Sequence, residues 1–156
     1  MQPDTARADR RPVLVVEDSD DDFETVVIAA ARAKVGNPLV RAADADAARR
    51  LLSADTAGSF AFMLLDHNLP GPDGLALLDQ IRCDGSLAGL PVVVFSTSVN
   101  PRDRALFFAA GASAFHVKSV QYTDCLDTIQ SIFGHWLNGA PPPNEAAVSL
   151  PARRPA

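Results

Sequence analysis

The sequence predicts an α/β protein built on an open parallel sheet with helices on both faces. Five short apolar runs alternate with amphipathic segments along the chain, the pattern of repeated strand-helix units. The runs contain few polar residues, as expected for parallel strands that are buried on both faces. A length of 156 residues is enough for one domain with a proper core.

The apolar runs give the five expected strands. They are PVLVV at 12–16, PLVRAA at 38–43, FAFMLL at 60–65, PVVVF at 91–95 and AFHV at 114–117. The second run is the least regular, because Arg41 interrupts it. Each run is followed by a segment that has the spacing of a helix.

The first helix shows this spacing most clearly. Its expected buried face follows i, i+3, i+4, i+7 and i+8 and consists of Phe23, Val26, Val27, Ala30 and Ala31. Ser19 is the expected N-cap, and the acidic residues after it suit the positive end of the helix dipole. The other four helices are expected at 44–52, 74–82, 101–111 and 126–137.

The two ends of the chain have a different composition. Residues 1–10 are polar and are expected to form a mobile leader before a domain at 11–137. The segment 138–156 holds five of the twelve prolines without helical periodicity, which predicts a disordered tail. This tail is too short for a helix-turn-helix module, so we expect no direct DNA binding.

Composition excludes several classes of function. A net charge of -5 argues against a general binder of nucleic acid or membrane surfaces. No apolar run approaches the ~20 residues that span a bilayer, and the N-terminus lacks the apolar core of a signal peptide. The two cysteines, Cys83 and Cys125, match no zinc spacing and predict free thiols in a reducing cytoplasm.

Polar residues follow four of the five predicted strands. The first strand leads into Glu17 and Asp18, the third into Asp66, the fourth into Ser96 and the fifth into Lys118. In open parallel sheets, sites form beyond the carboxyl ends of the strands. These side chains are therefore expected to meet on one rim.

Three carboxylates on one rim require a cation. Two of them ~5 Å apart repel by ~3 kcal/mol at an effective dielectric of about 20, and Lys118 supplies a single positive charge. Oxygen ligands with room for water suit Mg²⁺. A carboxylate beside Mg²⁺, a hydroxyl and a lysine can attack phosphorus. The pattern predicts Mg²⁺-dependent formation of an aspartyl phosphate at Asp66.

Four segments in this order, VLVVEDS, LLDHNLPGPDG, PVVVFSTS and HVKS, resemble the receiver domain of two-component response regulators. The resemblance covers about residues 11–137. It implies a flavodoxin-like, doubly wound sheet of five parallel strands in the order 2-1-3-4-5 with five helices. It also implies a phosphoacceptor protein rather than an enzyme, one that catalyses only its own phosphorylation, from a sensor histidine kinase, and its own dephosphorylation.

The resemblance assigns roles to the acidic site. Asp66 is the implied phosphoacceptor, and it shares Mg²⁺ with Glu17, Asp18 and the backbone carbonyl of Asn68. Glu17 replaces the commoner aspartate, so it is expected to reach the metal through water. His67 follows the phosphoacceptor, and two interpretations stay open: it adjusts access to Asp66 or autodephosphorylation, or it is a partly exposed histidine with no special role.

The switch residues are also implied by the resemblance. Ser96 is the switch hydroxyl, Lys118 contacts the phosphoryl group, and Phe115 is the aromatic residue that turns inward on phosphorylation. Receivers usually carry a proline with a cis bond after this lysine, whereas this chain has Ser119. A trans bond is therefore expected.

A finer resemblance points to small regulators that partner phytochrome-type histidine kinases. It is carried by VED near the start, STS after the fourth strand and FGHWL at 133–137. It implies a bacteriophytochrome kinase and a homodimer through the fourth helix, fifth strand and fifth helix. Phe107, Phe108 and Trp136 are expected on that face, although the two phenylalanines cannot both point at the sheet.

Two alternatives remain open at this point. One is a degenerate receiver that acts as a scaffold without phosphorylation, which a misplaced Lys118 would permit. The other is a phosphatase of the haloacid dehalogenase type that uses Asp18 with Mg²⁺. That alternative leaves Asp66 without a role and predicts that Asp18→Asn, but not Asp66→Asn, abolishes covalent phosphate capture.

Overall fold

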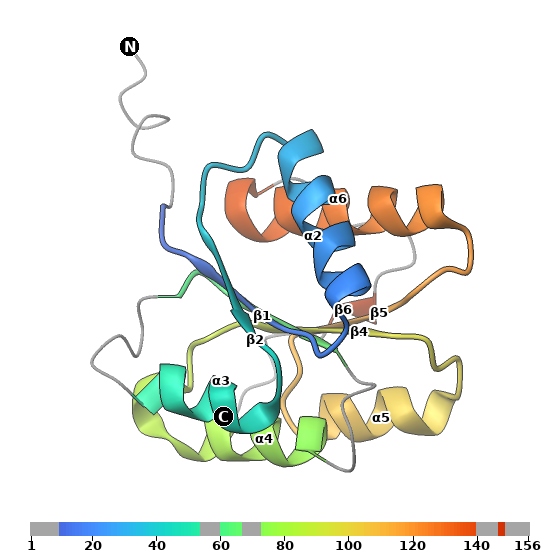
Figure 1. Cartoon of the computed structure of the whole chain (residues 1–156). Coiled ribbons are helices and arrows are strands. Elements are labelled where there is room, and N and C mark those ends of the chain that lie inside the picture. The colour runs from blue at the N-terminus through green and yellow to red at the C-terminus, as the bar shows by residue number, and fades with distance from the viewer. Residues whose placement is uncertain (1–9, 54–59, 67–72, 140–146, 149–156) are drawn as a thin grey trace.

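The computed structural model describes residues 10–53, 60–66, 73–139 and 147–148. The elements, labelled as in Figure 1, are β1 (Val13–Val16), α2 (Asp20–Arg32), β2 (Leu39–Ala42), α3 (Ala45–Ser53), β3 (Met63–Asp66), α4 (Asp73–Cys83), the 3-10 turn η1 (Gly85–Leu87), β4 (Val92–Ser96), α5 (Pro101–Ala109), β5 (Ala114–Val117), α6 (Tyr122–Asn138) and β6 (Ala147–Val148). All five predicted strands and helices are present.

The sheet has the predicted topology. Its order is β2-β1-β3-β4-β5-β6, and the first five strands are parallel. The sixth strand is a two-residue segment, antiparallel to β5, that the sequence pattern did not indicate. It lies within the tail that we predicted to be disordered. The rest of that tail, apart from Asn138 and Gly139, and the leader up to residue 9 lie outside the described residues.

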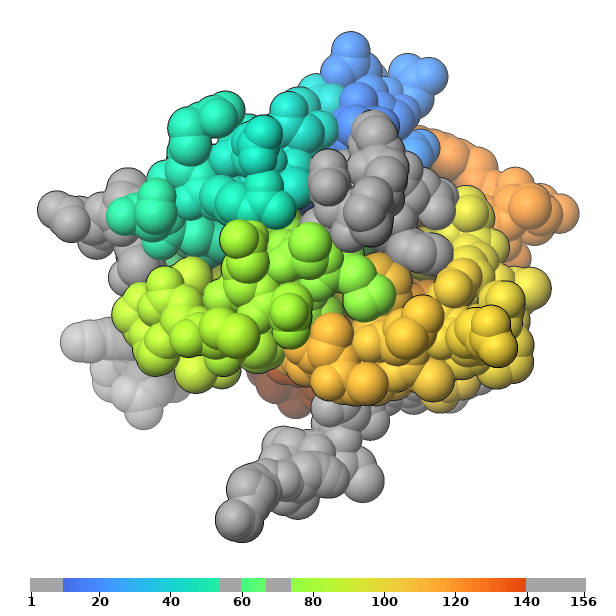
Figure 2. Space-filling view, turned by 90° about the horizontal axis from the view of Figure 1, so that it is seen from below, coloured from blue at the N-terminus to red at the C-terminus, as the bar shows by residue number. Residues whose placement is uncertain are grey.

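Helices cover both faces of the sheet. Helices α2 and α6 lie on one side, and α3, α4 and α5 lie on the other (Figure 1). Figure 2, which looks at the molecule from below, shows α3, α4 and α5 side by side as an outer layer. The two faces of the sheet carry separate buried clusters, one under each helix layer.

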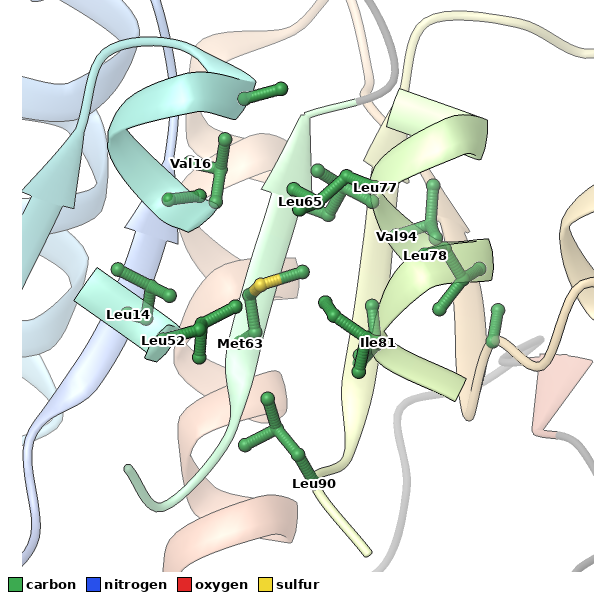
Figure 3. Packing of buried hydrophobic residues seen from close by; sticks show 14 of the residues in the cluster. Leu14, Val16, Leu52, Met63, Leu65, Leu77, Leu78, Ile81, Leu90 and Val94 are labelled. Carbon is green, nitrogen blue, oxygen red and sulfur yellow. The ribbon is translucent and has the colours of Figure 1, made fainter. Parts of the chain in front are cut away.

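Large aliphatic side chains fill the layer under α3 and α4. Leu14 and Met63 from the sheet pack with Leu52, Leu77 and Ile81 from these helices (Figure 3). All five are at most 3% exposed. Burying such a side chain contributes roughly 1.5–3 kcal/mol, so this packing fixes the strands whose ends form the site.

Helix α2 begins where the sequence predicts, but its buried face is rotated. Ser19 is the N-cap, and its Oγ accepts a hydrogen bond from the backbone N–H of Asp22 at 3.2 Å. Ala29 is buried, whereas Val27 is 41% exposed. The prediction of Val27 and Ala31 as core residues is wrong. In this run of small apolar residues, the helix face formed by Val26, Ala29 and Ala30 packs more tightly and is the one that is buried.

The position of Phe107 also corrects a prediction. We expected Phe107 on a dimer face, but it is 2% exposed and its ring centroid lies 6.0 Å from that of Phe115. Phe108 is half-buried, with the Arg104 guanidinium 5.9 Å from its ring. Phe107 thus belongs to the core, and Phe108 packs against the same buried cluster while staying partly exposed.

Helix α6, with 17 residues, closes the other face of the sheet. Leu126, Ile129 and Phe133 are buried as predicted. Trp136 is half-buried, and its ring centroid lies 6.4 Å from that of Phe62. No helix in the described part of the chain has the length and apolar character that crossing a membrane needs.

Candidate functional site

The carboxyl ends of β1, β3, β4 and β5 bring the predicted polar residues together. Glu17 and Asp18 directly follow β1, and Asp66 is the last residue of the neighbouring strand β3. Ser96 ends β4, and its register partner Val117 directly precedes Lys118. Strand order reverses between β1 and β3, which is where ligand sites form in doubly wound sheets.

Three carboxylates converge at this point. One oxygen from each of Glu17, Asp18 and Asp66 lies within 4.8 Å of the others. Glu17 and Asp66 are each 4% exposed, whereas Asp18 is exposed. A set of hard oxygen donors with one side open to water fits Mg²⁺ or Mn²⁺.

Burial and the neighbouring carboxylate change the titration of Glu17. Desolvation by burial and a side-chain hydrogen bond with Asp66 raise the pKa of Glu17 to about 8, although the charge of Lys118 opposes the shift. The Ser19 backbone N–H donates to Glu17 Oε2 at 3.2 Å and orients the carboxyl group. Burial and the nearby carboxylate thus favour the protonated form of Glu17, and a bound cation would compete with that proton.

Lys118 supplies the positive charge inside the site. Its Nζ lies 3.4 Å from Asp66 Oδ1 and 3.6 Å from Glu17 Oε1. Burial lowers the pKa of Lys118, but the attraction of Asp66, Glu17 and Asp22 outweighs burial and raises it. The group is therefore an ammonium ion. The described residues contain no cis peptide bond, so the expected trans bond to Ser119 is compatible with this close approach.

The site includes two residues, Asp22 and Arg41, that the sequence pattern did not assign to it. Asp22 Oδ2 lies 3.3 Å from Lys118 Nζ. Arg41, which interrupts the second predicted strand, donates from Nε to the backbone carbonyl of Glu17 at 3.0 Å and pairs with Asp20 at 2.7 Å. Its guanidinium also lies 5.2 Å from the centre of the Phe23 ring. Arg41 thus links the loop after β1 to strand β2.

The structure also places the predicted switch residues. Ser96 is fully buried, and its Oγ accepts a hydrogen bond from the Ser98 backbone N–H at 2.9 Å. Phe115 is 3% exposed, so the ring that we expected to turn inward on phosphorylation already lies inward. Asn68 and His67 lie outside the described residues.

The chain is similar in sequence to a known family of proteins. The model of the response regulator receiver domain family matches residues 13–130. Among curated proteins, response regulator Rcp1 of Synechocystis sp. is 29% identical over 144 residues, which are 90% of this chain and 92% of Rcp1.

Two solved structures share the fold over most of their length. The phosphorylated cyanobacterial phytochrome response regulator RcpA superposes with a TM-score of 0.77 at 29% identity, over 86% of this chain and 99% of RcpA. The Mn²⁺-bound form of Rcp1 gives a TM-score of 0.76 at 28% identity, over 85% of this chain and 99% of that structure.

Proposed function

We propose, from the premise that the chain belongs to the response regulator receiver domain family, that Asp66 accepts a phosphoryl group from a sensor histidine kinase. The chain is related to phytochrome-associated response regulators, which supports a bacteriophytochrome as the kinase. One observation carries the proposal: three carboxylates lie within 4.8 Å of one another, and Lys118 Nζ lies 3.4 Å from Asp66.

The chemistry is a displacement at phosphorus. An oxygen of the Asp66 carboxylate attacks, a P–O bond forms, and the P–N bond of the phosphohistidine breaks with its electron pair left on the imidazole nitrogen. Lys118 donates to a phosphoryl oxygen and balances the charge that it carries, and the Ser96 hydroxyl donates to another. In dephosphorylation, water attacks phosphorus and the Asp66 carboxylate leaves.

Glu17, Asp18, Asp66 and the Asn68 carbonyl would hold Mg²⁺. Receiver domains bind Mg²⁺ or Mn²⁺ in an acidic pocket, and one related structure contains Mn²⁺. The bound cation supplies positive charge that offsets the repulsion between the carboxylates and the phosphoryl oxygens. The donor set fits because every ligand is a hard oxygen.

The product of the reaction is the phosphorylated protein itself, which acts as a signal, and no metabolite is released. Receiver-domain regulators are generally not classical enzymes, and we propose that this chain acts on no substrate other than its own Asp66. We also propose that the output is a changed surface formed by α5, β5 and α6, through which two copies pair as a homodimer. The protein would act in the cytoplasm through protein partners, without direct contact to DNA.

Incubation with acetyl phosphate, followed by intact-mass measurement, tests the phosphoacceptor. The parent protein should gain the mass of one phosphoryl group when Mg²⁺ is present and should gain little when it is chelated. Asp66→Asn should gain none, because the amide is a poor nucleophile. Uptake by Asp66→Asn equal to that of the parent would exclude Asp66 as the acceptor.

The same measurement separates the two alternatives. A folded parent that takes no phosphate from acetyl phosphate or from any kinase of a panel would be a phosphorylation-independent scaffold. Uptake abolished by Asp18→Asn but retained by Asp66→Asn would indicate a phosphatase of the haloacid dehalogenase type. The burial of Asp66 beside Lys118 favours the receiver reaction over both.

A further inference from the structure

Asp22, in the first turn of α2, contacts the ammonium group of Lys118. Its Oδ2 lies 3.3 Å from Lys118 Nζ, as near as Asp66 Oδ1 at 3.4 Å, although Asp22 and Lys118 are 96 positions apart. The Lys118 side chain is 9% exposed, whereas that of Asp22 is 51% exposed. The ammonium group is therefore shared between the phosphoacceptor and helix α2.

Asp22 differs from the other carboxylates around Lys118. Glu17 and Asp66 belong to the acidic cluster that would hold a cation, and Asp22 does not. With a cation bound, the oxygens of Glu17 and Asp66 are shared with it. Three carboxylates among the described residues lie within ion-pair distance of Lys118 Nζ, those of Glu17, Asp22 and Asp66. Of these, Asp22 is the one that remains available to Lys118 when a cation is bound.

The backbone around Lys118 does not by itself fix the position of the side chain. The Lys118 N–H donates to the Ser96 carbonyl at 2.6 Å, which fixes the main chain but not the flexible four-carbon side chain. Val117 and Val120 on either side are 43% and 100% exposed, and Ser119 stands where receivers usually have proline. A pocket of about 340 Å³ beside Lys118 gives the ammonium group room to leave Asp66.

We propose that Asp22 is a positioning residue that holds Lys118 Nζ beside Asp66, where the ammonium group meets the incoming phosphoryl group. The inference rests on the proposed function, because it gives Asp22 a part in the phosphorylation of Asp66. The bonds made and broken are those of that transfer. Lys118 keeps its proton throughout, and Asp22 contributes only its charge and its place on α2.

The initial rate of phosphorylation by acetyl phosphate in the presence of Mg²⁺ tests this role. Asp22→Ala should lower the rate about fivefold, because a misplaced ammonium stabilises the phosphoryl oxygens less well. Asp21→Ala is the matched control: it removes the same charge from the same exposed turn, and its rate should change by less than about twofold. Asp22→Glu, which keeps the charge, should recover most of the parent rate.

A second comparison asks whether Asp22 acts through Lys118. Adding Asp22→Ala to Lys118→Ala should cause no further loss of rate, whereas a purely structural role would lower both backgrounds equally. Thermal unfolding midpoints of Asp22→Ala and Asp21→Ala should agree. Equal rates for these two variants, or a further loss in the Lys118→Ala background, would overturn the positioning role while the parent's phosphorylation still supports the proposed function. A parent that takes no phosphate on Asp66 would instead refute the proposed function itself.

Discussion

The imidazole of His116 is buried in strand β5. The residue is 6% exposed, and its Nε2 has no hydrogen-bond partner in the described part of the chain. Burial, together with the charge of His135, lowers the pKa of His116 from 6.5 to about 4. The folded protein therefore holds this histidine neutral under conditions in which an unfolded chain would protonate it.

This difference predicts acid sensitivity. Between pH 6.5 and about 4 the unfolded chain binds a proton at His116 and the folded chain does not, so the free energy of unfolding falls as the pH falls. The slope from this residue should reach about 1.4 kcal/mol per pH unit. His116→Leu should remove that part of the slope in urea unfolding measured across the window without divalent cations.

The variant must be compared with the parent, because Glu17 also contributes to the pH dependence of the free energy of unfolding. Its pKa rises from 4.5 to about 8 on folding, so its contribution runs the other way and stability falls as the pH rises between these values. Parent and His116→Leu share this contribution, and the difference between their slopes isolates His116. Identical slopes would show that His116 is protonated in the folded protein as readily as in the unfolded chain.

Most of the individual site residues could be predicted from the sequence. Asp66, Glu17 and Lys118 each follow or end a recognisable apolar run, and parallel pairing places all such ends on one rim. Asp22 could not be predicted in the same way. It is one of three consecutive acids that suit a helix start equally well, and its partner lies 96 positions away.

At the scale of elements, the turn from α5 to β5 depends on one glycine. Gly111 has a φ of 109°, a conformation that L side chains rarely adopt. A Cβ at this position would lie 2.6 Å from Arg82 Cγ. Arg82 cannot withdraw easily, because its Nε donates to the Gly111 carbonyl at 2.9 Å and its Nη1 to the Ala88 carbonyl at 3.2 Å. The side chain from α4 thus fixes the turn.

We therefore expect Gly111→Ala to destabilise the fold. Strain at this φ alone costs on the order of 1–3 kcal/mol, and the displacement of Arg82 adds to it. Gly89→Ala is the matched control, since a Cβ there meets nothing within 4 Å and its φ is not positive. Its effect should stay within about 1 kcal/mol. Equal urea midpoints for the two variants would contradict the role given to Gly111.

The elements were easier to predict than the faces they bury. All five helices and the five parallel strands follow from the alternation of apolar runs with amphipathic segments. In α2, however, the sequence VVIAAA offers two overlapping faces of similar apolar character, and the helix buries Ala29 rather than Val27. Strand β6 has two residues, too few to show any periodicity.

At the scale of the whole molecule, topology explains why the site could be foreseen. A doubly wound sheet has one point where strand order reverses, and here that point lies between β1 and β3. The packing in Figure 3 holds those strands in register, with Leu14 opposite Met63. The surface that contacts signalling partners is determined instead by exposed side chains. The pattern of apolar residues in the sequence does not predict how those side chains are oriented.

The surface formed by α5, β5 and α6 remains our prediction for the homodimer, with a changed set of contacts. Phe107 is withdrawn into the core, so Leu106, which is 50% exposed, and the half-buried Phe108 are the apolar side chains that α5 offers to a second copy. An exposed leucine is costly to leave in water and favours association once a complementary surface covers it.

Leu106→Glu should therefore convert the dimer to a monomer, because two glutamates buried at or near a two-fold interface lose hydration and repel each other. Val27→Glu is the control: Val27 is a 41% exposed apolar residue on α2, in the helix layer opposite α5 (Figure 1). Light scattering after size-exclusion chromatography, at concentrations where the parent is dimeric, measures both variants. A parent that stays monomeric, or a Leu106→Glu variant that stays dimeric, would place any self-association on another face.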